Sequence, residues 1–284
     1  VNHLRQAMRD FVAGADMAGT RVRAFYPFVR VQVSSASRKS AGLDSRLSYG
    51  FVAEPGRFET TLTRPDLFAF YIRQQLALLL QNHGVSLQVG TSNQPIPIHF
   101  SFADDEHMEG SLSPERQALM REVFDLPDLA AMDDGIANGT HESAPGDAQP
   151  LSLFTAPRVD YSLHRLRHYT GTAPEDFQHY ILLTNYHRYV DEFVRWACRQ
   201  LGNGYDRLAC PGGLDITADD PDADRAAADF AWRKNQMPAW HLIGPNGTGI
   251  TLVNIGVGPA NAKTICDHLA VLRPEAWLMI GHCG

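Results

Sequence analysis

The sequence is poor in the features that mark membrane, secreted and metal-binding proteins. It has only four cysteines among 284 residues, and no two of them have the spacing of a metal-binding pair. Its apolar runs are too short to span a bilayer, and its first residues are polar and helix-like, unlike a signal peptide. The net charge of −7 disfavours general affinity for nucleic acid or anionic membranes. We therefore expect reduced thiols, a cytoplasmic location, and no nucleic-acid or membrane partner.

What remains is the composition of an ordinary globular protein, with 44% hydrophobic and 20% charged residues. A chain of this length is long for one core and sufficient for two domains. Residues 138–150 contain Gly, Ser and Pro without periodicity, which is typical of a loop between domains. We therefore place one domain at residues 1–150 and a second at residues 151–284.

The first domain has the pattern of an α+β fold with an antiparallel sheet. The segments with strand-like alternation or composition are residues 26–33, 47–53, 57–62 and 85–89. The segments with helical spacing are residues 1–18, 67–82 and 114–123. The sequence around the second helix predicts Thr63 as its N-cap, Pro65 in its first turn and Gly84 at its end.

The second domain has the pattern of an α/β fold. Its expected strands are residues 180–183, 207–210, 240–243, 250–255 and 277–280, and its expected helices are residues 158–169, 190–201, 226–234 and 262–272. The last strand, helix and strand form a unit that is normally a crossover in a parallel sheet. Ligands of such sheets bind at the carboxyl ends of the strands, so residues 256–261 and 281–284 should face one crevice.

The glycine-rich segment Gly256–Lys263 does not match the two common nucleotide motifs. It lacks the third glycine of the dinucleotide fingerprint, and Val257 and Ala262 replace the glycines of a phosphate loop. Its two glycines permit a tight turn from strand to helix. The final Gly281-His-Cys-Gly284 lets a flat ligand approach the backbone; Cys283 is a nucleophile or, as we favour, a small packing residue.

Two further segments carry positive groups. Residues 184–188, Thr-Asn-Tyr-His-Arg, place donors and a cation where a strand passes into a helix, which suits an anion site or, alternatively, an exposed ion pair. His164 and His168 are four residues apart on a basic helix, but no third ligand accompanies them, so we expect no metal. These basic groups suit phosphate contacts or a subunit interface.

Four stretches together resemble the AMP nucleosidase family, hydrolases of the purine nucleoside phosphorylase superfamily. They are RVDYSLHRLRHYTGT at residues 158–172, TNYHRYVDEFVRW at 184–196, QMPAWHL at 236–242, and residues 249–284 with GVGPANAKT and WLMIGHCG. A thinner match is TTLTRPDLF at residues 60–68. The resemblance implies an α+β N-terminal domain, regulatory in role, followed by the first part of an α/β phosphorylase-like three-layer domain.

The resemblance also implies an activity: hydrolysis of the N-glycosidic bond of AMP to adenine and ribose 5-phosphate. Such enzymes need no cofactor for the chemistry, assemble as homohexamers, and respond to MgATP as an allosteric activator and to phosphate as an inhibitor. Two alternatives stay open. One is a phosphorolytic relative with the same fold, and the other is a nucleotide-sensing regulatory module without catalysis.

The family pattern implies that Arg188 holds an anion and that His168 reaches into a neighbouring subunit's site. With the strand-end loops, the expected substrate-binding residues are Asn185, Tyr186, Arg188, His168, Gly256, Gly258, His282, Cys283 and Gly284. The family's purine-protonating Asp and ribose-binding Met-Glu motif lie beyond Gly284, so the resemblance implies a C-terminally truncated chain. We expect this polypeptide alone to be inactive and to expose an unfinished sheet edge.

Overall fold

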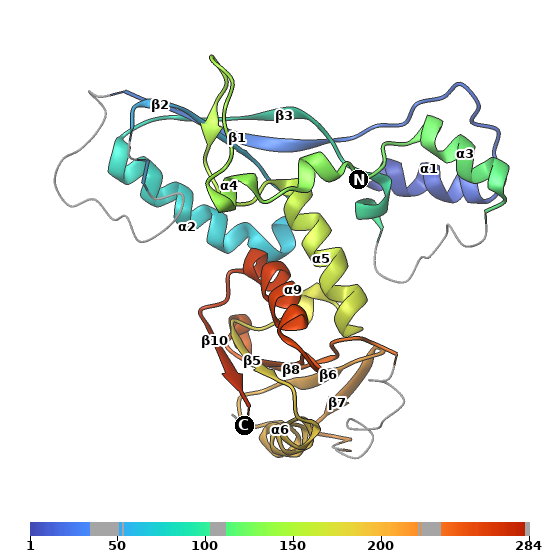
Figure 1. Ribbon diagram of the computed structural model, residues 1–284, viewed down its shortest axis with the longest axis vertical. Helices are drawn as coiled ribbons and strands as arrows, with labels where there is room; N and C mark the ends of the chain where they lie inside the picture. The colour runs from blue at the N-terminus through green and yellow to red at the C-terminus, as the bar shows by residue number, and fades with distance from the viewer. Residues whose placement is uncertain (35–50, 53, 103–111, 221, 223–233, 282–284) are drawn as a thin grey trace. The chain divides into compact units, whose positions relative to one another are not determined.

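The computed structural model describes the whole chain apart from residues 35–50, 53, 103–111, 221, 223–233 and 282–284 (Figure 1). Most of the expected strand 47–53 and of the expected helix 226–234 therefore lies outside the described residues. The chain divides into two compact units, Val1–Tyr161 and Ser162–Gly284. This division falls inside helix α5 (Ala156–Thr170). The domain boundary at residue 150 stays a prediction.

The first unit contains a four-stranded sheet in the order β3-β1-β2-β4. The strands are β1 (Phe25–Val33), β2 (Gly56–Thr61), β3 (Leu87–Pro95) and β4 (Gln149–Pro150). β1 pairs antiparallel with both β2 and β3, and the short β4 pairs parallel with β2. The expected antiparallel sheet is present, with two residues of the linker segment added as its last strand.

Helices of the first unit follow the apolar spacing of the sequence. They are α1 (Asn2–Val12), α2 (Pro65–His83), α3 (Pro114–Val123) and α4 (Gly135–Asn138), with short 3-10 helices at Ile98–Ser101 and Leu129–Met132. α1 buries Leu4, Met8 and Phe11, and the Phe11 ring meets Phe124 edge-on at 5.7 Å between centroids. α3 has the bounds that the sequence predicts.

The predicted N-cap of α2 is wrong. Arg64 occupies the cap position in the left-handed region at φ 44° and ψ 65°, and its side chain forms no capping hydrogen bond. The Thr63 hydroxyl instead donates to Oδ1 of Asp160 at 2.8 Å, while the Tyr26 hydroxyl donates to Oδ2 at 2.7 Å. A buried carboxylate without hydrogen-bond partners costs free energy, and a hydrogen bond to a charged group is strong. The Thr63 hydroxyl therefore donates to Asp160 and does not cap the helix.

The second unit contains a six-stranded sheet in the order β10-β5-β9-β8-β6-β7. The strands are β5 (Tyr180–Thr184), β6 (Arg207–Cys210), β7 (Leu214–Thr217), β8 (Ala239–Ile243), β9 (Ile250–Asn254) and β10 (Ala276–Ile280). β10, β5 and β9 are parallel, while β8, β6 and β7 add antiparallel pairs. The expected hairpin of β8 and β9 is confirmed, and β5 lies between β9 and β10.

Two helices cover opposite faces of this sheet (Figure 1): α6 (His187–Gln200) and α9 (Pro259–Leu269). Short 3-10 helices lie at Pro174–Asp176, Pro245–Gly247 and Ala270–Leu272. α6 packs Val190, Phe193, Val194 and Ala197 on a core that includes Trp240 and Leu252. At the sheet's outer strand β10, Trp277, Leu278 and Met279 are 45%, 60% and 49% exposed. The structure thus combines α and β elements in two sheets, as the sequence indicates.

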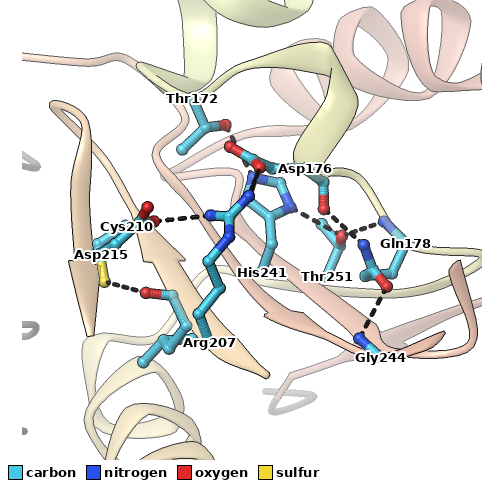
Figure 2. Close-up of polar contacts among 10 residues, drawn as sticks. Thr172, Asp176, Gln178, Arg207, Cys210, Asp215, His241, Gly244 and Thr251 are labelled. Atoms are coloured by element: carbon cyan, nitrogen blue, oxygen red, sulfur yellow. Dashed lines mark hydrogen bonds and ion pairs between the residues drawn. The ribbon is translucent and has the colours of Figure 1, made fainter. Parts of the chain in front are cut away.

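A buried chain of hydrogen bonds joins β8, β9 and the segment before β5 (Figure 2). Both ring nitrogens of His241 lie 2.8 Å from threonine hydroxyls, Nδ1 from Thr251 and Nε2 from Thr172. The side chain of Gln178 accepts from the amides of Gly244 and Gly249, which fixes the turn between β8 and β9. These contacts set the position of β9, whose end carries the candidate site. Within the described ranges, no helix is long and apolar enough to cross a membrane.

Candidate functional site at the ends of three parallel strands

Three parallel strands end at the same level of the second sheet. Thr184 at the end of β5 is in register with Ile280 of β10 and with Asn254 of β9. The segments that follow these strands therefore begin at one edge. A β-carbon added to Gly281 would lie 3.5 Å from Oδ1 of Asn185, which places the start of the Gly281–Gly284 stretch against the β5 loop. The two loops expected to share a crevice, which follow β9 and β10, thus start at the same edge but on either side of the β5 loop.

Two helix N-termini lie at this edge. α6 begins after Tyr186 and α9 after Gly258, and no side chain of the described residues caps either start. The N–H groups of a first helical turn point along the helix axis, and together with the helix dipole they make such ends attractive to anions. Gly256 and Gly258 have φ values of 63° and 103°, a conformation that favours glycine, so the turn between β9 and α9 depends on both.

Asparagine side chains hold the β9 loop in shape. Asn254, which is 4% exposed, accepts at Oδ1 from the amide of Gly256 at 3.0 Å, and its Nδ2 lies 3.4 Å from Nδ1 of His187. Asn261 donates from Nδ2 to the carbonyl of Ile255 at 3.0 Å and accepts at Oδ1 from Gln236 at 3.2 Å. The sequence interpretation missed these residues. A polar residue at the end of an otherwise apolar strand is the signal that could have identified Asn254.

The expected binding residues are placed as follows. Asn185, Tyr186 and Arg188 are exposed at the start of α6, and Gly256 and Gly258 form the facing turn. Among the described residues, none forms a hydrogen bond or ion pair with the Arg188 side chain, so the alternative of a structural ion pair finds no support there.

The other expected residues are not brought to this edge by the described contacts. His168 is exposed on α5, where its ring meets Tyr169 at 5.5 Å between centroids. His282, Cys283 and Gly284 lie outside the described residues, so their expected role stays a prediction. In the part of the chain that the structure describes, no group of three or more His, Cys, Asp or Glu side chains could hold a metal ion.

Chemically, the edge offers amide donors, an exposed guanidinium and a turn that contains two glycines. This arrangement suits a phosphate group attached to a flat or cyclic ligand. The fold and the edge together define an α/β protein with a candidate anion site at the carboxyl ends of parallel strands.

Residues 1–148 match the sequence model of a family described as "Bacterial AMP nucleoside phosphorylase N-terminus". The chain belongs to this family.

Individual relatives agree with that assignment. The chain is 44% identical over 288 aligned positions to AMP nucleosidase of Escherichia coli strain K12, and equally to that of Escherichia coli O157:H7. Each alignment covers 99% of this chain and 58% of the relative, so the chain spans little more than half of these relatives' length. The crystal structure of AMP nucleosidase from Bacteroides thetaiotaomicron is 26% identical, covering 44% of this chain and 40% of that one, with a TM-score of 0.29. The resemblance to the AMP nucleosidase family is confirmed.

Proposed function

We propose that this chain belongs to an enzyme that hydrolyses the N-glycosidic bond of AMP, giving adenine and ribose 5-phosphate. The observation that carries the proposal is the strand-end edge, where two helix N-termini without side-chain caps, Arg188 and a glycine turn follow the ends of neighbouring strands. The Escherichia coli relatives carry the name AMP nucleosidase. In this proposal the edge binds the 5′-phosphate, and the glycine turn lies along the sugar.

The chemistry of the reaction explains why such a site should bind the 5′-phosphate. Cleavage of the bond between ribose and adenine passes through a transition state with positive charge on the sugar. The enzyme must hold the ribose in place while adenine leaves with a proton and water attacks. The 5′-phosphate takes no part in the bond cleavage. The enzyme can therefore bind it to hold the ribose at the reacting centre.

The described residues at the edge supply donors and positive charge, and none of them is assigned as the acid for the departing base. By the family pattern, that acid and the ribose-binding motif follow Gly284. The described edge is therefore assigned to the sugar and phosphate end of the ligand. For the 284-residue polypeptide we expect binding of ribose 5-phosphate without release of adenine from AMP.

Isothermal titration calorimetry tests the assignment with ribose 5-phosphate, AMP and ribose. We expect ribose 5-phosphate to bind and ribose to bind far more weakly. Arg188→Ala should weaken ribose 5-phosphate binding by about tenfold or more, the effect of a lost charge-assisted hydrogen bond. Arg195→Ala is the matched control, because Arg195 is an exposed arginine of the same helix whose ion-pair distance to Glu192 is 3.5 Å. Equal affinities for ribose and ribose 5-phosphate would refute the proposal.

Turnover separates this function from its two alternatives. A phosphorolytic relative would use phosphate as a cosubstrate and form ribose 1,5-bisphosphate, whereas the proposed hydrolase uses water. A regulatory module would bind nucleotide through residues 1–150 alone. Adenine release from AMP by the 284-residue polypeptide at the rate of a whole relative would contradict our placement of the acid.

We also propose the assembly and regulation that the family pattern implies. These are a cytoplasmic homohexamer that MgATP activates and phosphate inhibits, with a phosphorylase-like three-layer second domain and no cofactor in the reaction. Sedimentation velocity with and without MgATP tests the assembly. Competition of inorganic phosphate with ribose 5-phosphate tests whether inhibition acts at the strand-end edge.

A further inference from the structure

The sequence contains three Asn-Gly pairs: Asn138-Gly139, Asn203-Gly204 and Asn246-Gly247. Asparagine is thermolabile, and it loses its side-chain amide most readily before glycine, which has no β-carbon to shield its backbone nitrogen. All three asparagines are exposed, so exposure does not distinguish them. Their backbone conformations and hydrogen bonds differ, and these decide where the reaction can occur in the folded chain.

The loss of the amide proceeds in two steps. The backbone nitrogen of the glycine attacks the side-chain carbonyl carbon of the asparagine; a C–N bond forms, the attacking nitrogen loses its proton, and the side-chain nitrogen leaves as ammonia. Water then opens the resulting cyclic imide at either carbonyl, which gives aspartate or isoaspartate. The first step therefore needs a glycine nitrogen that is free of hydrogen bonds and can move against the asparagine side chain.

Two of the pairs are held in conformations that oppose this attack. The backbone nitrogen of Gly139 donates to a carbonyl in the last turn of α4 at 3.2 Å. Asn246 has φ 54° and ψ 30°, which holds the Gly247 nitrogen on the side of Cα away from Cβ. The amide and the hydroxyl of Thr248 both donate to the carbonyl of Pro245, and ring closure would have to open that turn.

Asn203 lies in the turn after α6 and differs from both. It is not among the residues with a positive φ, and within the described chain the N–H of Gly204 donates to no acceptor. Gly202 and Gly204 flank it with φ values of 79° and 93°, and a β-carbon on Gly204 would meet nothing within 4 Å. Among the described contacts, the Asn203 side chain makes one hydrogen bond, from Nδ2 to the carbonyl of Arg199 at 3.3 Å.

We propose that Asn203 is a deamidation site of the folded protein, converted to aspartate or isoaspartate ahead of Asn138 and Asn246. The site needs no partner other than water, since the neighbouring glycine supplies the nucleophile. It lies at the end of α6 opposite to Arg188, so the inference is independent of the proposed function.

The modification has a structural consequence for the end of α6. The new carboxylate would lie at the carbonyl of Arg199, in the last turn of the helix, where the dipole is negative. A hydrogen bond is thereby replaced by repulsion. The isoaspartate product also lengthens the backbone beside the 2.9 Å bond from the Asn203 amide to the carbonyl of Gln200. Deamidation should therefore loosen the last turn of α6.

Peptide mapping by mass spectrometry follows all three sites while the 284-residue polypeptide is incubated at mildly alkaline pH, and enzymatic isoaspartyl methylation identifies the isoaspartate. In the folded chain we expect Asn203 to react about tenfold faster or more than the other two, because those must first open hydrogen-bonded turns. In denaturant the three rates should become similar. A rate at Asn138 or Asn246 that equals the rate at Asn203 in the folded chain would overturn the proposal. A preference for Asn203 that persists unchanged in denaturant would also overturn it, because sequence and not fold would then set the rate.

Two substitutions test the consequence for the helix. Asn203→Asp reproduces the aspartate product and should lower the midpoint of denaturation followed by tryptophan fluorescence. Asn246→Asp is the matched control, because it adds the same charge to an exposed Asn-Gly turn that contacts no helix end through this side chain among the described residues. Its midpoint should fall less. Equal midpoints of the two variants would refute the consequence drawn for α6.

Discussion

Nε2 of His241 lies 2.8 Å from the hydroxyl of Thr172, and this pair has a defined direction. Thr170 donates its hydroxyl proton to the carbonyl of Leu166, so the 2.9 Å contact between Thr170 and Thr172 is a donation from Thr172. With that proton used, Thr172 can only accept from Nε2–H of His241. Nδ1 of the neutral ring then accepts from Thr251. The chain of bonds holds the imidazole uncharged in the core (Figure 2).

The first prediction is that the free energy of unfolding of the second unit falls at acidic pH because His241 is buried in its neutral form. Burial, with a smaller effect from Arg207, lowers the pKa of His241 from 6.5 to about 3. Between these values the unfolded chain binds a proton that the folded unit excludes, so its free energy of unfolding falls as the pH falls from 6.5 towards 3. The slope from this group is at most about 1.4 kcal/mol per pH unit.

Tryptophan fluorescence measures this slope selectively, because all four tryptophans of the chain lie after residue 162. Denaturant titrations at several pH values should show a shallower dependence for His241→Asn, at the cost of about 1–3 kcal/mol from polar partners left unpaired. His164→Asn removes an exposed histidine and should leave the slope unchanged. An unaltered slope in His241→Asn would contradict the prediction.

The second prediction is an opposite pH dependence in the first unit. Burial raises the pKa of Asp160 from 3.8 to about 6 against the lowering effect of its bonds from Tyr26 and Thr63. The folded unit therefore keeps a proton that the unfolded chain loses, and its stability falls as the pH rises from about 4 to about 6. Hydrogen exchange of β1 amides should show this loss, and Asp160→Asn should abolish it. Asp147→Asn, at an exposed site, is the control.

The third prediction concerns the turn between β8 and β9. A β-carbon on Gly249 would lie 1.9 Å from the carbonyl oxygen of Leu242 and 2.7 Å from Oε1 of Gln178. Gly249→Ala must therefore displace backbone and should destabilise the second unit by about 3 kcal/mol or more. Gly212→Ala is the comparison: its φ of 82° is strained for alanine, but nothing lies within 4 Å, so about 1–2 kcal/mol is expected. Equal losses in denaturant titrations would refute this reading of the turn.

The fourth prediction concerns the outer strand β10. Three consecutive side chains of this strand, Trp277, Leu278 and Met279, are about half exposed. An apolar strand at a sheet edge can pair with another chain, so we expect concentration-dependent association of the 284-residue polypeptide. Leu278→Lys should reduce it in sedimentation velocity experiments. Leu129→Lys changes a leucine that is 77% exposed outside any sheet and should not reduce it.

Local signals predicted most elements well. α3 has its predicted bounds because Ser113 caps it and Pro114 opens it, both within one turn of the chain. Thr63 failed as a cap because its partner, Asp160, lies on a helix far along the sequence. Helix-capping propensity depends on residues that are close in sequence. The hydrogen bond from Thr63 to the buried Asp160 carboxylate outweighs that propensity.

The site was predictable only in outline. The strand and glycine patterns of the sequence predict that Arg188 and Gly256 follow strand ends at one edge, and the structure shows both there. Their role in ligand binding stays a prediction. The link between His187 and Asn254 was not predictable, because it depends on β5 lying between β9 and β10. Strand order is set by packing of the whole sheet, and the sequence of one strand does not encode its neighbours.

Helix α5 has a practical consequence for anyone who would divide this protein. The two units meet between Tyr161 and Ser162, in the middle of a continuous helix that runs from Ala156 to Thr170. A gene cut there would give each half an unfinished helical end with broken backbone hydrogen bonds. Division of the chain should therefore be made at the exposed stretch around Gly146, so that either product carries α5 whole or not at all.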